Sequence, residues 1–173
     1  ARPKWDGRKR GPLVGPDESL QVLRSLRKAL QIGHEQGMGG ALLLRIAENG
    51  ERTIDRPLMR GWTLDHDGVS WRLILAKRGS LFFYNLGARA EDADGIYAKV
   101  LWGSFVKKAK HRGAGRMHVR FGRIKAIKGD DFKWDGAAEF RFLNSDGIHI
   151  VGVGMKNVVT PENDEPISAV AQF

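Results

Sequence analysis

The chain has 173 residues, with 29 lysines and arginines against 20 aspartates and glutamates, and it contains no cysteine. This length fits one globular domain, and the lack of cysteine excludes a disulfide scaffold, a thiolate zinc site, an iron–sulfur cluster and a cysteine nucleophile. The apolar runs are short, so we expect a soluble protein without a transmembrane helix or secretory signal.

The first 16 residues combine proline and glycine with basic side chains and show no hydrophobic period, which predicts an extended basic arm. A helix is predicted from Pro16 to Ile32, because proline suits a first helical turn and Gly33 can stop a helix. Its leucines recur at helical spacing, so one side should be apolar and the other basic. Residues 17–159 are expected to form a single β-rich domain that includes this helix, and residues 160–173 a polar C-terminal tail.

Beyond the glycines of residues 33–40, the hydrophobic period changes from helical to strand-like. Two hairpins are expected first, at residues 42–56 and residues 62–75. Their turns are predicted at Glu48–Glu51 and Asp65–Gly68, where acidic residues, asparagine and glycine come together.

Further strands are predicted at residues 81–85, 97–106, 117–126, 138–142 and 148–150. A polar loop should span residues 87–95, and a slip of the apolar phase at Gly122 predicts a β-bulge. Together these elements predict a mainly β fold: a single antiparallel β-barrel or sandwich with one N-terminal amphipathic helix and an extended basic N-terminal arm. Parallel α/β folds are not expected, because nothing supplies the repeated crossover helices.

The net charge of +9 is concentrated in two segments. One is the arm, and the other is residues 95–129, which contain ten lysines and arginines and no acidic residue, whereas residues 130–173 carry a net charge of −5. Such an asymmetry can attract phosphate or join copies of one protein head to tail. The residues that we predict to contact nucleic acid or a neighbouring subunit are Arg8, Lys9, Arg10, Lys107, Lys108, Lys110, Arg112, Arg116, Arg120 and Arg123.

Nucleic-acid binding is one interpretation of the second basic segment. Basic residues flank Gly113 and Gly115, which predicts a flexible loop able to approach a phosphate backbone closely. Aromatic residues nearby in the sequence would stack on bases if they were exposed, but their apolar alternation predicts that they belong to the core. These aromatic residues are Phe82, Phe83, Tyr84, Trp102 and Phe105.

A small basic ribonuclease is the strongest enzymatic interpretation. His111 and His118 lie among basic residues, and Glu139 is on a predicted neighbouring strand, so these groups could move a proton while arginines hold a phosphate. The opposing interpretation is that His111 lies in an exposed loop and His118 is an outward-facing strand residue. The acidic pairs lie where turns favour acidic residues, so we predict no metal site and no cofactor.

An assembly protein is the interpretation that the sequence favours most. A hairpin-built β domain with a basic arm and no catalytic cluster fits a viral shell, neck or tail component, in which charge meets packaged genome or an adjacent copy. A basic amphipathic helix (Ser19–Ile32), LMRGWTLDHDGVSW and YNLGARAEDADGIYAKVLWGS follow one another within residues 18–104. This layout resembles small neck or tail-completion proteins of tailed phages, and the segment RMHVRFGRIKAIKG with the last hairpin departs from it.

The resemblance implies a ring- or shell-forming subunit and supplies no active-site residue. We therefore predict a non-enzymatic structural subunit of a virion-type assembly, such as a phage capsid, neck or tail component, assembled in the host cytoplasm. Its expected partners are copies of itself and other assembly subunits, with nucleic acid as a further partner through phosphate contacts, and no membrane.

Overall fold

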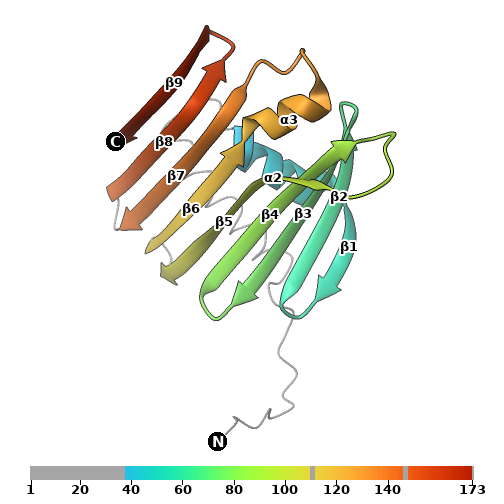
Figure 1. Ribbon diagram of the computed structural model, residues 1–173. Coiled ribbons are helices and arrows are strands. Elements are labelled where there is room, and N and C mark those ends of the chain that lie inside the picture. Colours follow the sequence, from blue (N-terminus) through green and yellow to red (C-terminus); the bar gives the residue numbers. More distant parts are fainter. Residues whose placement is uncertain (1–37, 110–111, 146–147, 173) are drawn as a thin grey trace, which may run out of the picture.

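The computed structural model describes residues 38–109, 112–145 and 148–172 (Figure 1). Within them lie two helices and nine strands. In chain order these are α2 (Met38–Asn49), β1 (Glu51–Arg56), β2 (Met59–His66), β3 (Val69–Arg78), β4 (Leu81–Ala90), β5 (Ala98–Ala109), β6 (Arg112–Arg120), α3 (Phe121–Lys128), β7 (Asp135–Ser145), β8 (Ile148–Thr160) and β9 (Asn163–Gln172). The predicted arm and the predicted helix at residues 16–32 lie outside the described residues.

Every strand pairs antiparallel with the strand that follows it in the sequence, which gives one sheet in the order β1 to β9. This confirms the prediction of a mainly β, antiparallel fold. The sheet is open: within the described part of the chain, β1 and β9 form its two edges and do not pair with each other (Figure 1). A closed barrel or a two-sheet sandwich is therefore not what these strands form.

The two faces of the sheet follow from the strand period, because residues directly opposite each other on paired strands point to the same side. One side, which we call the inner face, carries an apolar row across six strands and packs against α2 and α3. This row consists of Trp62, Leu73, Leu86, Leu101, Val119 and Ala138. The opposite side is the outer face.

The segment at residues 42–46 is helical, so the prediction of a strand there is wrong. Leu43 and Ile46 are buried three residues apart, and half-buried Ala47 follows Leu43 by four, which is the spacing of a helix face. The predicted turn at Glu48–Glu51 instead ends α2, where the amide of Gly50 donates to the carbonyl of Ile46 at 2.8 Å. The strand β1 consequently pairs with β2 and not with residues 42–46.

The phase slip at Gly122 marks the start of α3 rather than a β-bulge. Phe121 and Ile124 are buried three residues apart, and α3 runs across one end of the sheet, close to β4, β5 and β7 (Figure 1). Its last residue, Lys128, places Nζ 2.6 Å from the carboxylate of Asp67 in the turn between β2 and β3, and this contact lowers the pKa of Asp67. α3 therefore connects the end of β6 with the turn between β2 and β3.

Gly113 and Gly115 lie inside β6, so the prediction of a flexible glycine loop is wrong. A Cβ on Gly115 would lie 2.5 Å from the ring of Phe142, and the rings of Phe142 and Phe105 stack at 5.9 Å between centroids. These glycines leave room for aromatic rings that cross neighbouring strands on the inner face.

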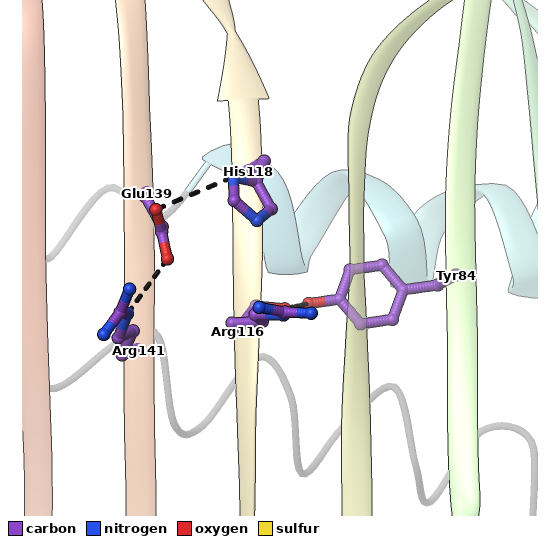
Figure 2. A network of polar contacts seen from close by, with 5 residues as sticks. All are labelled: Tyr84, Arg116, His118, Glu139 and Arg141. Atoms are coloured by element: carbon purple, nitrogen blue, oxygen red, sulfur yellow. Dashed lines mark hydrogen bonds and ion pairs between the residues drawn. The ribbon is translucent and has the colours of Figure 1, made fainter.

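The ring of Tyr84 likewise occupies space that the missing side chain of Gly103 leaves open. Its hydroxyl donates to the carbonyl of Arg116 at 2.7 Å, two strands away (Figure 2). A Cβ on Gly103 would lie 2.4 Å from the Tyr84 oxygen. Burial raises the pKa of Tyr84, so the phenol remains a neutral donor at physiological pH.

The hairpin through Asp65–Gly68 is confirmed, with Asp67 and Gly68 both in the left-handed conformation that such a two-residue turn requires. β4 extends to Ala90, so the predicted loop at residues 87–95 begins later than expected. β8 continues through Gly152 and Gly154, and the predicted polar tail contains an edge strand, β9.

Candidate functional site

The ten predicted contact residues do not form one continuous stripe. Arg8, Lys9, Arg10 and Lys110 lie outside the described residues. Lys107 and Lys108 belong to the last part of β5, Arg112 begins β6 beside them, and Arg123 lies on α3. Arg116 and Arg120 are exposed on the outer face of β6, where they pair with Ser104 and Ala137. The structure thus divides the predicted stripe between the far end of a hairpin, the outer face and α3.

A polar and aromatic row crosses the outer face at the level of His118. Cross-strand pairing aligns Asn85, Trp102, His118 and Glu139 on β4, β5, β6 and β7. The rings of Trp102 and His118 stack with centroids 5.3 Å apart and planes 13° apart. The ammonium of Lys99 lies 4.8 Å from the centre of the Trp102 ring, and the guanidinium of Arg120 lies 5.9 Å from it. Cations and aromatic rings therefore converge on an exposed face.

A bulge in β5 produces this convergence. Gly87 pairs with Lys99 and Leu86 pairs with Leu101, which leaves Val100 as an extra residue. Val100 and Leu101 are both buried, and the bulge brings Lys99 and Trp102 to the same face although they are three residues apart. Sequence reasoning missed this pair because uninterrupted alternation places residues three apart on opposite faces. The only signal was two consecutive apolar residues inside an alternating strand.

Glu139 is the acidic member of the row, and Arg141 and His118 lie beside its carboxylate (Figure 2). Its carboxylate accepts from Nε of Arg141 at 2.9 Å, and His118 Nδ1 lies 3.9 Å from its other oxygen. The hydrogen bond from Arg141 is the largest cause of the lowered pKa of Glu139. The carboxylate is therefore an anion at neutral pH that orients His118 and Arg141.

His118 and Glu139 lie on neighbouring strands, as the ribonuclease interpretation required, and His118 faces outward, as the opposing interpretation predicted. Their separation of 3.9 Å allows a direct ionic contact when His118 is protonated. His111 lies outside the described residues. In the described part, the pair is accompanied on the same face by Arg116 and Arg141, which suits anion binding.

A second aromatic and basic cluster continues the outer face toward β3. Tyr97 lies over Gly87, where a Cβ would come within 2.7 Å of it. The guanidinium carbons of Arg72 and Arg89 each lie 4.6 Å from the centre of the Tyr97 ring, and its hydroxyl is 3.0 Å from Ser70 Oγ. The ring thus holds two arginines on the same side of the sheet as Lys99.

The five aromatic residues predicted to fill the core divide between the two faces. Phe82, Tyr84 and Phe105 are buried on the inner face, which confirms the prediction for these three. Phe83 is 43% exposed and Trp102 is half-buried on the outer face, so for these two it is wrong. Phe83 and Trp102 add stacking surface to the basic outer face.

Within the described ranges, no group of histidine and acidic side chains is placed to hold a metal ion, and no helix has the length and apolar character to cross a membrane. Comparison of the chain with protein-family models, with curated proteins and with solved structures finds no match in any of the three. The function must therefore be argued from the outer face itself.

Proposed function

We propose that the protein binds single-stranded nucleic acid on the outer face of its sheet, without catalysing a reaction on it. The observation that carries the proposal is the Trp102–His118 stack with Lys99 and Arg120 beside it. Proteins that bind single strands combine a basic surface, which follows the phosphates, with aromatic rings on which bases stack. The outer face offers both on adjacent strands.

The charges on this face favour a polyanion. Arg116, Arg120, Arg141 and Lys156 are exposed on β6, β7 and β8. The acidic residue among them, Glu139, is already paired with Arg141. Lys99 is exposed as well, so a base can replace its ammonium over the Trp102 ring while the lysine moves to a phosphate.

A single strand fits this arrangement better than a duplex. The bases of a duplex are stacked on each other and present only their edges, whereas unpaired bases can lie against Trp102 and Phe83. Phe83 pairs with Ser104 and Trp102 pairs with Asn85 on the same face of β4 and β5. The two rings therefore lie within one short stretch of the sheet.

The test is fluorescence anisotropy of the full chain with labelled oligo(dT) and oligo(U) of about 15 nucleotides and a duplex of equal length. We expect binding to both single strands, weaker binding to the duplex, and a linear fall of log K with log salt between about 50 and 200 mM. Lack of binding to single strands at about 50 mM salt would refute the proposal.

The matched variants are Trp102→Ala and, as a control away from the outer face, Trp134→Ala. Trp134 is half-buried against Phe121, with ring centroids 5.1 Å apart. Loss of a stacked base should weaken binding by about 1–3 kcal/mol in Trp102→Ala. Trp134→Ala should leave the affinity of the folded protein for the oligonucleotide unchanged. Equal effects of the two variants would argue against stacking at Trp102.

A structural role in a virion-type assembly is the second candidate, and the open sheet supports it. β1 is an edge rich in charge, whereas the last part of β9 contains Ser168, Ala169 and Val170, with Val170 90% exposed. An uncharged edge of this kind can pair with a strand of another chain. The resemblance to phage neck and tail-completion proteins supports the same role.

Light scattering on the wild type and on Val170→Lys tests the assembly role. A particle larger than the monomer that dissociates in Val170→Lys would support it, because a charged edge residue opposes strand pairing. A monomer at all concentrations would count against assembly and leave the nucleic-acid proposal intact. Cleavage of the labelled RNA that is lost in His118→Ala would instead favour the ribonuclease interpretation.

A further inference from the structure

A hollow of about 440 Å³ opens where β6 ends and α3 begins. Three cationic side chains line it, together with an amide and small residues, and no acidic residue lines it. The lining residues are Arg120, Gly122, Arg123, Gly136, Ala137, Lys156 and Asn157. Positive charge thus surrounds a concave part of an open sheet, which is the arrangement that binds an anion.

Irregular backbone in two strands shapes this hollow. The register of β7 on β8 shifts next to Gly136, and the register of β8 on β9 shifts around Asn157. Gly136 and Asn157 have φ angles of 81° and 51°, and a Cβ on Gly136 would lie 2.1 Å from the Asn157 carbonyl oxygen. Bulges with left-handed residues re-aim side chains and recur beside functional sites.

The side chains around the hollow are partly held in place. Arg123 donates from Nη1 to the carbonyl of Lys99 at 2.7 Å, which fixes its guanidinium and leaves other N–H groups to donate. Arg120 and Lys156 are exposed, and within the described part of the chain no carboxylate pairs with either of them or with Arg123.

Asp135 is the acidic residue next to the hollow, and its carboxylate is already bound by two donors of the protein. It accepts from the amide of Gly136 at 2.7 Å, and Lys125 Nζ lies 3.2 Å from its other oxygen. The hydrogen bond from Gly136 and then that from Lys125 lower the pKa of Asp135. Asp135 therefore opposes an incoming anion less than an unpaired carboxylate would.

Arg120 connects the hollow with the Trp102–His118 stack on the outer face. Arg120 lines the hollow and also lies 5.9 Å from the centre of the Trp102 ring. A second, smaller depression of about 270 Å³ is lined by His118, Arg120, Glu139 and Lys156, among others, and so shares two of its cations with the hollow. A ligand can extend from one to the other.

We propose that this hollow binds one backbone phosphate of the nucleic acid, through Arg120, Arg123 and Lys156, while a neighbouring base stacks at Trp102. The inference rests on the proposed function and names the residues that hold the bound nucleic acid at one end of the outer face. It also sets a direction for the ligand, from the Trp102–His118 stack on β5 and β6 toward the bulges of β7 and β8.

The test uses the full chain with labelled oligo(dT) of about 15 nucleotides and, separately, inorganic phosphate followed by amide chemical shifts. Arg120→Gln, Arg123→Gln and Lys156→Gln are compared with Arg56→Gln and Arg78→Gln, which remove exposed arginines of β1 and β3. Combining the three substitutions in the hollow should reduce the magnitude of the salt slope by about 0.7, because one phosphate is neutralised there; each single substitution should cause part of this reduction, and neither control should change the slope. Thermal unfolding of each variant confirms that it is folded.

The outcomes separate the hollow from the proposed function. Equal salt slopes in hollow and control variants, with binding retained, would overturn the phosphate site and leave the proposed function standing. No oligonucleotide binding, but shifts of the Gly122 and Gly136 amides with phosphate, would support an anion site and overturn the proposed function. Neither oligonucleotide binding nor amide shifts would overturn both.

Discussion

The inner and outer faces of the sheet are built from alternate residues of the same strands, yet they differ in what their side chains contact. On β4, Leu86 is fully buried against the apolar row, while its neighbour Asn85 is exposed beside Trp102. Burial of apolar area stabilises the fold, and exposed cations contribute little to stability but strongly to anion binding. Stability and the proposed binding should therefore be separable by substituting neighbouring residues of one strand.

The largest expected effect is on the inner face. Leu86→Ala should reduce the free energy of unfolding by about 2–5 kcal/mol, because it opens a cavity where the side chain is wholly buried. Asn85→Ala, one residue earlier, should change it by less than about 0.5 kcal/mol. Urea unfolding monitored by circular dichroism measures both. Similar losses in the two variants would contradict the division into an inner and an outer face.

Glycines on the two faces give a second matched pair. A Cβ on Gly103 would lie 2.0 Å from the Arg116 carbonyl oxygen, whereas the atom nearest to a Cβ on Gly154 is 4.0 Å away. Gly103→Ala should destabilise the protein by about 1–3 kcal/mol through overpacking, and Gly154→Ala should be neutral or stabilising by up to about 1 kcal/mol. Thermal unfolding distinguishes them, and a destabilised Gly154→Ala would show that the outer face of β8 is covered.

Acid should weaken the contacts that hold α3. The pKa values of Asp67 and Asp135 are lowered in the folded state by Lys128 and by Gly136 with Lys125, respectively. Their contribution to stability is therefore complete above their ordinary pKa of 3.8 and is lost as pH falls through the lowered folded values.

Urea unfolding at a series of pH values tests this contribution. The double variant Asp67→Asn with Asp135→Asn should be less stable than wild type at pH 7 and should lose less stability on acidification. A wild type and a double variant with parallel pH profiles would show that these two pairs do not stabilise the fold.

The smallest effect on stability should come from Glu139→Gln, with a change below about 0.5 kcal/mol. Removal of this carboxylate releases Arg141 and His118, so binding of single-stranded oligonucleotide should become tighter and its salt dependence steeper. Glu51→Gln removes the same charge on β1, at the edge of the sheet and distant from β7. This control should change neither the affinity for the oligonucleotide nor its salt dependence. Weaker binding in Glu139→Gln would show that the bound oligonucleotide does not lie over β7.

The sequence predicted most strands because alternation continues through them, as at Val69, Trp71, Leu73 and Leu75 in β3, all of which are buried. The sequence-based prediction was wrong where the spacing of apolar residues fits both the strand period and the helix period. Residues 42–46 alternate like a strand, yet the contacts of Leu43 and Ile46 with the sheet select a helix. Tertiary packing decides such cases, and local pattern does not contain it.

The candidate site was only partly predictable for a related reason. Arg116 and Arg120 follow from charge, and His118 beside Glu139 follows from the predicted neighbouring strands. The approach of Lys99 to Trp102 depends on a bulge whose position the alternation does not fix, and the hollow depends on register shifts beside Gly136 in β7 and Asn157 in β8. Register irregularities of this kind arise from pairing across strands, so a single strand's sequence does not specify them.

Since each strand pairs with the next one in the chain, the contacts that form the sheet are close in sequence throughout. Such low contact order predicts rapid folding, in which one hairpin can template the next. It also makes the sheet modular at its C-terminal end: deletion of β9 would remove the partner of β8 alone and leave seven of the eight strand pairings intact.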